Sequence, residues 1–165
     1  MTAALGHVGL TVPSLDQAVG WYRDVLGCKV IAGPTEVRAH DGHAGRMAAE
    51  VFGSDSVAFR QAHLGLANGV ALELFEFVTP ATETPPQPFA FWQTGTFHLC
   101  LVDPEVDALV ETIRASGGRQ RTAIWAIRAG EPYRMCYCED PFGNVLEVYS
   151  HSHEETYAGQ RAAVA

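Results

Sequence analysis

The hydrophobic pattern at the start of the chain changes from a strand period to a helix period within a few residues. Residues 6–12 carry β-branched and apolar side chains in alternation with small or polar ones, which predicts a strand that ends at Pro13. Ser14 is the predicted N-cap of a helix, because its oxygen can accept a hydrogen bond from the first turn. The helix is predicted to end at Gly27, and its apolar stripe consists of Leu15, Val19, Tyr22, Val25 and Leu26.

The same change of pattern returns in the second half of the chain. Residues 96–102 predict another strand, and Asp103 is the predicted N-cap of a second helix. Pro104 would occupy the first helical position, where the missing N–H of proline costs no hydrogen bond. This helix is predicted to end at Gly117 and Gly118, and its apolar stripe consists of Val106, Leu109, Val110 and Ile113.

Three strand candidates follow each predicted helix, so each half has the order β-α-β-β-β. They span residues 28–32, 57–64 and 70–78 in the first half, and 122–128, 133–139 and 145–150 in the second. Because the order repeats, we predict an α+β fold made of two βαβββ modules.

One insertion interrupts the first module. Residues 33–56 have no counterpart in the second half and are predicted to form a loop with a short helix at 46–52. The segment that follows the first module contains four prolines between residues 79 and 88, which is typical of a linker. The predicted boundaries are modules 5–78 and 96–150 within a single domain at 1–150, a linker at 79–95, and a C-terminal tail at 151–165.

Charge and hydropathy exclude two classes of partner. The chain has 165 residues with 11 Lys and Arg against 19 Asp and Glu, a net charge of -8, which disfavours binding to nucleic acid. No apolar run approaches the length of about 18 residues that a membrane span requires. The N-terminus lacks the basic start of a secretory signal, so we expect a cytoplasmic protein that binds a small-molecule substrate.

The duplicated pattern places histidine and glutamate at matching positions. His7 and His98 stand at the opening strand of each half, and Glu73 and Glu147 stand in the closing strand, flanked by Leu or Val. A carboxylate in an apolar strand is costly to bury alone, and a divalent metal ion would compensate its charge. Two imidazoles and two carboxylates could therefore form a mixed nitrogen and oxygen metal site.

A structural role for these residues is the alternative that the sequence leaves open. A strand histidine can be a hydrogen-bonded core residue, and a strand glutamate can lie on the solvent face of an antiparallel sheet. Glu76 competes with Glu73, although their spacing of three makes them face opposite sides of the strand. Further histidines that could bind a metal or simply be solvated are His40, His43, His151 and His153.

Two segments of the chain carry a family resemblance. The first segment comprises residues 7–12 and 18–27 (AVGWYRDVLG), and the second comprises residues 139–147 (EDPFGNVLE). Together they resemble the vicinal oxygen chelate superfamily, which includes glyoxalase I, bleomycin resistance proteins and extradiol dioxygenases. The resemblance is closest to glyoxalase I-like members. The resemblance covers about residues 5 to 150. It implies paired βαβββ modules whose curved mixed sheets form a metal-centred half-barrel cavity, and a homodimer.

The resemblance also implies roles for individual residues. His7, Glu73, His98 and Glu147 match the four metal-ligand positions of glyoxalase I-like members, with Zn, Ni, Co, Mn or Fe as the divalent ion. Glu147 would be the catalytic base and Glu73 its counterpart. The implied activity is that of a metal-dependent lyase or isomerase, which abstracts a proton from a small oxygen-chelating substrate and stabilises the enolate.

Two other functions stay open from the sequence. His7, His98 and Glu147 alone would suit the iron site of an extradiol-type dioxygenase, so Glu73 discriminates between the two enzyme classes. A metal-free protein that binds a small molecule, as in drug resistance, is the third possibility. Counterparts of the glutathione-binding residues of glyoxalase I are not found. Glu73 shares its strand face with Phe75 and Phe77, which predicts an aromatic surface beside it.

Overall fold

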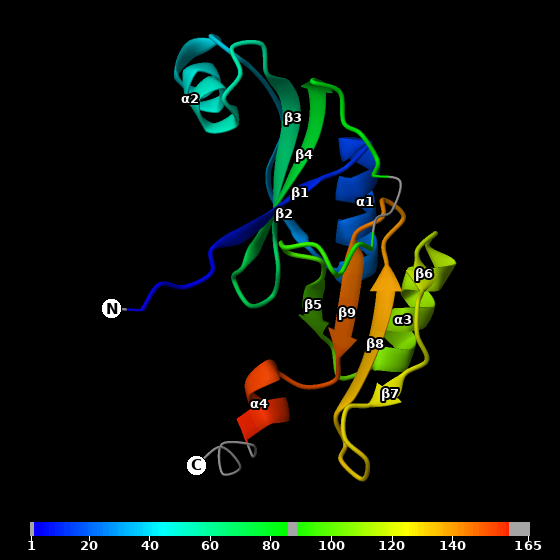
Figure 1. Cartoon of the computed structure of the whole chain (residues 1–165). Helices are drawn as coiled ribbons and strands as arrows, with labels where there is room; N and C mark the ends of the chain where they lie inside the picture. The colour runs from blue at the N-terminus through cyan, green and yellow to red at the C-terminus, as the bar shows by residue number, and fades with distance from the viewer. Residues whose placement is uncertain (1, 86–88, 159–165) are drawn as a thin grey trace. The chain divides into compact units, whose positions relative to one another are not determined.

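The chain folds into two compact units, Met1–Thr84 and Pro85–Ala165, in a computed structural model that describes residues 2–85 and 89–158 (Figure 1). Residues 86–88 of the predicted linker and 159–165 of the predicted tail lie outside the described residues. Among the helices within the described ranges, none combines the length and the apolar character needed to cross a membrane.

The first unit is a four-stranded mixed sheet with two helices. The sheet has the order β1-β4-β3-β2, in which β1 runs parallel to β4 and the other neighbours are antiparallel. Its elements are β1 (His7–Thr11), α1 (Leu15–Leu26), β2 (Lys29–Arg38), α2 (Gly42–Phe52), β3 (Ala58–Gly65) and β4 (Ala71–Thr79).

The second unit repeats this topology. The strands follow the order β5-β9-β8-β6, with β5 parallel to β9, and β7 pairs with β8 beside them. Its elements are β5 (Leu99–Val102), α3 (Val106–Ala115), β6 (Arg119–Gln120), β7 (Trp125–Ala126), β8 (Arg134–Glu139), β9 (Val145–Tyr149) and α4 (His153–Tyr157). The α+β class with two mixed, open sheets is therefore confirmed, and the predicted strand-helix repeat is present in both units.

The two faces of the first sheet differ in what they pack against. Alternate residues of β3 and β4, Ala62, Leu64, Leu72 and Leu74, are almost completely buried, as are Leu15 and Tyr22 of α1. Helix α1 contacts β3 and β4, so this face forms the core of the unit. Since successive side chains of a strand point to opposite faces, the intervening residues of β3 and β4 lie on the other face.

The N-terminus of α3 differs from the prediction. Helix α3 begins at Val106, with Glu105 at the N-cap, rather than at Pro104. Asp103 lies two residues before this N-cap, and its Oδ1 accepts a hydrogen bond from the N–H of Glu105 at 2.8 Å, which closes a turn ahead of the helix. The predicted apolar stripe is nevertheless confirmed, since Val106, Val110 and Ile113 are buried.

The insertion of the first unit is more regular than predicted. Strand β2 continues to Arg38, because residues 35–38 pair with residues 58–61 of β3 after two register shifts. Helix α2 starts at Gly42, four residues before the predicted start, and Gly53 ends it with a left-handed φ of 64°. The segment at 33–56 thus contains the end of β2 and a three-turn helix, where a loop with a shorter helix was predicted.

The second half also departs from the prediction at its edges. The strand predicted at 122–128 is limited to residues 125–126, and the pairing at 119–120 lies before it. His98 precedes β5, which begins at Leu99 rather than at 96. Residues 153–157 of the predicted tail form α4, whose Ser152 and Glu155 make a capping box.

Candidate functional site

The first unit brings His7 and Glu73 together. His7 Nε2 lies 3.3 Å from Glu73 Oε2, and the side chains are 60% and 21% exposed. His7 belongs to β1 and Glu73 to β4, which run side by side in parallel. Gly9 is the residue directly opposite Glu73, so His7 stands two residues before the register partner of the glutamate, on the same face of the sheet.

A third polar side chain, His63, lies beside this pair. His63 of β3 is directly opposite Glu73, and its Nδ1 lies 3.8 Å from Glu73 Oε1. His63 is not among the site residues predicted from the sequence, although the hairpin contains a signal for it. The turn between β3 and β4 is centred on Asn68, where Leu66 N–H donates to Val70 O, and counting outward from that turn pairs residues 63 and 73.

The second unit brings His98 and Glu147 together in the same way. His98 Nε2 lies 3.3 Å from Glu147 Oε2, and the side chains are 26% and 8% exposed. Strands β5 and β9 are parallel, and Cys100 is the residue opposite Glu147. His98 therefore stands two residues before the register partner of its glutamate, as His7 does in the first unit.

The neighbours of Glu147 are an aromatic hydroxyl and a thiol. Tyr137 of β8 is directly opposite Glu147, and burial together with its hydrogen bond to the Glu147 carboxylate raises the pKa of Tyr137 to about 12. Poor hydration of the thiol and the nearby negative charge of Glu147 likewise raise the pKa of Cys100 to about 12. Both groups are therefore protonated at neutral pH and can donate hydrogen bonds to the carboxylate.

His98 is held among aromatic rings. The rings of Phe97 and Tyr137 meet the His98 ring edge-on, with centroids at 4.6 and 5.5 Å. His98 Nδ1 is buried and has no hydrogen-bond partner among the described residues. A buried ring nitrogen without a partner is costly, so this imidazole retains capacity for a further ligand.

The donor chemistry of each pair fits a divalent metal ion. Imidazole nitrogen and carboxylate oxygen together suit Zn, Ni, Co, Mn and Fe. Within residues 2–85 and 89–158, no group of three or more His, Cys, Asp or Glu side chains is arranged to hold a metal ion. Each unit therefore supplies one His–Glu pair, which is two of the four predicted ligands.

The rival residues have other partners. Glu76 accepts hydrogen bonds from Leu15 N–H and from Arg60 Nη1, both at 3.0 Å. Its carboxylate therefore lies on the face of the sheet that packs against α1, opposite to the face of Glu73. His151 Nδ1 lies 2.7 Å from Ser150 Oγ, and the His153 ring lies tilted against the Tyr157 ring within α4, with centroids 4.6 Å apart. His40 and His43 flank the N-terminus of α2, and neither forms an ion pair among the described residues.

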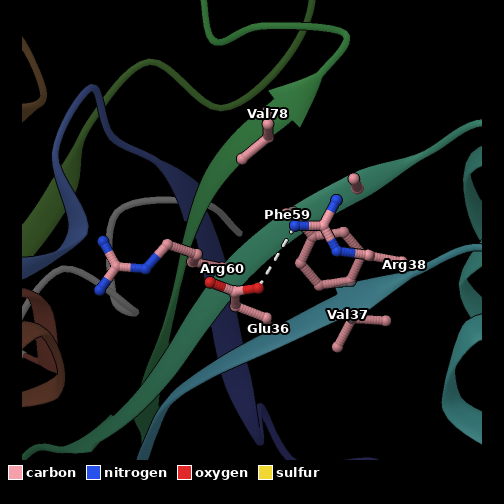
Figure 2. Close-up of a pocket in the computed structure, with 7 residues that line it drawn as sticks. Glu36, Val37, Arg38, Phe59, Arg60 and Val78 are labelled. Carbon is pink, nitrogen blue, oxygen red and sulfur yellow. Dashed lines mark hydrogen bonds and ion pairs between the residues drawn. The ribbon is translucent and has the colours of Figure 1, made fainter. Parts of the chain in front are cut away.

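A small hollow beside residues 36–38 does not form a site. It has a volume of about 30 Å³, which is the space of about one water molecule. Figure 2 shows Glu36 turned towards Arg38, at 3.4 Å, and Arg60 extending away from them. Arg60 pairs with Asp16 and Glu76, so no free arginine points into this hollow among the residues that line it.

A larger hollow lies beside Glu73. Its volume is about 210 Å³, and it lies between α2 and the face of the sheet that carries Glu73, Gln61 and Phe75. The predicted aromatic surface is present there, since Phe52, Phe59, Phe75 and Phe77 form a cluster with ring centroids 5.1 to 6.0 Å apart. The carboxylate of the first pair thus borders an apolar cavity.

Comparison with known proteins identifies the family. The model of the glyoxalase/bleomycin resistance protein/dioxygenase superfamily matches residues 4–148, which is most of the chain. The chain belongs to this superfamily. The resemblance predicted from residues 7–12, 18–27 and 139–147 is therefore confirmed.

Individual relatives include an enzyme and several structures of the same fold. A 2-epi-5-epi-valiolone epimerase from an Actinomyces species is 30% identical over 150 residues, which cover 88% of this chain and 78% of the relative. A glyoxalase family protein from Bacillus cereus is 19% identical, with a TM-score of 0.74 over 90% of this chain and 94% of that one. A fosfomycin resistance protein from Listeria monocytogenes, crystallised with Mn(II) and 1S,2S-dihydroxypropylphosphonic acid, is 15% identical, with a TM-score of 0.62 over 98% of this chain and 100% of that one.

Proposed function

We propose that the protein is a metal-dependent isomerase that epimerises a carbon next to the carbonyl of a small, oxygen-rich ketone. The observation that carries the proposal is the equivalence of the two His–Glu pairs, each at 3.3 Å and each in the same register of its sheet. Epimerisation removes a proton from one face of a carbon and returns it on the other, which calls for two carboxyl groups of related position. The epimerase among the relatives supports the same reaction class.

The metal ligands of this proposal are His7, Glu73, His98 and Glu147. Their imidazole and carboxylate donors fit a divalent ion, and in each unit the Nε2 of the histidine lies 3.3 Å from Oε2 of its glutamate. A divalent ion bound there would supply Lewis acidity, which stabilises negative charge on a substrate oxygen. The involvement of Glu73 favours this four-ligand set over the two-histidine, one-carboxylate set of a dioxygenase.

The proton is moved by the two glutamates. We assign to Glu147 the removal of the proton from the carbon beside the carbonyl, because its side chain is shielded from water and lies in the second His–Glu pair. Glu73 would return a proton to the opposite face of the same carbon. The aromatic rings around His98 limit the access of water to the carboxylate and reduce competing protonation by solvent.

Proton exchange with D₂O tests this assignment. Metal-loaded protein is mixed with 2-epi-5-epi-valiolone and, separately, with acetoin, and deuterium at the carbon beside the ketone is measured by mass spectrometry. We expect exchange with at least one ketone, its loss after dialysis against EDTA, and its recovery on addition of a divalent metal. Glu147→Gln should abolish exchange of the epimer whose C–H bond faces Glu147, while the circular dichroism spectrum is unchanged.

The matched control is Glu111→Gln, an exposed glutamate of α3 in the same unit, which should exchange at the wild-type rate. Full activity of Glu147→Gln would reject its role as base. Absence of exchange with both ketones, or exchange that is insensitive to EDTA, would reject a metal-dependent isomerase. Oxygen consumption with Fe(II) and a catechol in place of exchange would assign the protein to the dioxygenases.

A further inference from the structure

Helix α2 presents an apolar face that is only partly covered. Residues 44, 47, 48, 51 and 52 recur at the spacing i, i+3, i+4, i+7 and i+8, which places them on one side of the helix. Met47 and Val51 are 55% and 68% exposed although both are large and apolar. Exposed apolar residues gathered on one face indicate a binding surface more often than isolated ones do.

The C-terminal end of this face is anchored to the sheet. The ring of Phe52 meets the rings of Phe59, Phe75 and Phe77 edge-on, with centroids at 5.4, 6.0 and 5.1 Å. Ala44 and Ala48 are the small residues of the same face, and they leave space between the helix and the sheet. The result is a cavity of about 210 Å³, here called the α2 pocket. Its lining consists of Val37, Ala44, Met47, Ala48, Val51, Phe52, Phe59, Gln61, Glu73 and Phe75.

The α2 pocket has the composition of a small-molecule site. Eight of its ten lining residues are apolar, and the two polar ones, Gln61 and Glu73, come from the neighbouring strands β3 and β4. An apolar cavity with a few polar groups is typical of ligand pockets in proteins.

The size of the pocket sets the size of the group that it can hold. A dry cavity of about 150 Å³ lined by Leu, Ile and Phe holds one benzene molecule. The α2 pocket exceeds that volume, and Met47 can adapt its flexible side chain to the shape of a bound group. A six-membered ring or an alkyl chain of comparable size therefore fits.

We propose that the α2 pocket binds an apolar ring or short alkyl chain of the substrate, with the ketone end of the substrate at Glu73. This inference rests on the proposed function for its reacting end, and it narrows the substrate class to oxygen-rich ketones that also carry an apolar substituent. The insertion at 33–56 is thereby a specificity element, since α2 supplies five of the ten lining residues.

Methyl NMR on metal-free protein tests the pocket without any turnover. The full chain, labelled with ¹³C at the methionine methyl groups and treated with EDTA, is titrated with acetophenone and with acetone. Met47 reports on the pocket and Met135 of the second unit serves as an internal reference. We expect acetophenone to shift the Met47 signal in a saturable manner without moving Met135, and acetone to produce no such shift at equal concentration.

A pair of lysine substitutions on α2 localises the binding. Val51→Lys places a charge in the lining and should weaken acetophenone binding at least tenfold, whereas Glu50→Lys, one residue away and outside the lining, should leave it within twofold. Both positions are exposed, so both variants should retain the wild-type circular dichroism spectrum.

Several results would overturn the inference. One is the absence of a saturable shift of the Met47 signal, and another is acetophenone binding by Val51→Lys that equals that of the wild type. A third is a Met47 signal that depends on protein concentration, together with a change of molecular mass in Val51→Lys. That result would make this face of α2 a contact between two copies of the chain. Failure of the deuterium exchange leaves this result untouched, because ring binding is measured without metal and without reaction.

Discussion

The two His–Glu pairs have the same geometry but different surroundings. Both pairs lie at 3.3 Å, and in both the histidine stands two residues before the register partner of the glutamate. Glu147 and His98 are, however, much less exposed than Glu73 and His7. The register of the duplicated sheet therefore fixes where the carboxylate lies, whereas the neighbouring side chains decide how much water reaches it.

The differences are concentrated at two equivalent positions. Opposite the glutamate on the antiparallel side, the first unit has His63 and the second has Tyr137. On the parallel side, the first unit has Gly9 and the second has Cys100. The second unit thus surrounds its carboxylate with hydrogen-bond donors, while the first leaves space that continues into the α2 pocket. Under the proposed function, one pair is suited to take the proton and the other to receive the substrate.

The largest expected effect concerns the separate roles of the glutamates. Glu73→Gln should lower the rate of epimerisation by about 10²- to 10⁴-fold, because one of two proton-transferring groups is lost. It should still exchange deuterium into the epimer whose C–H bond faces Glu147. The measurement is mass spectrometry of each pure epimer after incubation in D₂O with metal-loaded variant.

The control for this substitution is Glu50→Gln, an exposed glutamate of α2 in the same unit. Equal loss of exchange from both epimers in Glu73→Gln would show that the two carboxylates do not divide the faces of the substrate. The distinction drawn between the two units would then be wrong.

The second effect is on stability. His98→Ala leaves Glu147 nearly buried without its imidazole partner, and we expect a loss of about 2 kcal/mol in the free energy of unfolding. His7→Ala should cost less than about 0.5 kcal/mol, because Glu73 retains His63 nearby and is better hydrated. Urea denaturation in EDTA at pH 7 measures both values. Equal losses in the two variants would contradict the role of burial.

Much of this arrangement could be predicted from the sequence. The change from strand to helix period marked β1, α1 and α3, and the repeat placed histidine and glutamate at the positions where the structure pairs them. The helices and strands follow from local periodicity, which depends on residues close in the chain, whereas the matching histidine and glutamate positions follow from the internal repeat.

The features that could not be predicted depend on register or on packing between elements. His63 becomes a neighbour of Glu73 only through the pairing of β3 with β4, and Tyr137 meets Glu147 only through that of β8 with β9. The hollow beside α2 depends on which face of the helix turns to the sheet, so the sequence indicated an aromatic surface there but not a cavity. The predicted start of α3 was two residues too early, because Asp103 and the N–H of Glu105 form a separate turn and the helix begins at Val106.

The smallest expected effect is on the free energy of unfolding at alkaline pH, and it distinguishes Tyr137 from His63, its equivalent in the first unit. The pKa of Tyr137 is raised to about 12 in the folded protein, above the ordinary value of about 10 for an unfolded chain. A raised pKa means that the folded state holds the proton more tightly, so this contribution to stability is complete below about pH 10 and is lost as the pH rises towards 12. In metal-free protein, the free energy of unfolding should therefore fall less steeply between pH 10 and pH 11.5 in Tyr137→Phe than in wild type.

His63→Phe, the equivalent change in the first unit, should leave that slope unchanged, because the residue that it removes has no phenol to ionise. An identical slope in wild type and Tyr137→Phe would mean that the hydroxyl next to Glu147 is not held in its neutral form by the fold.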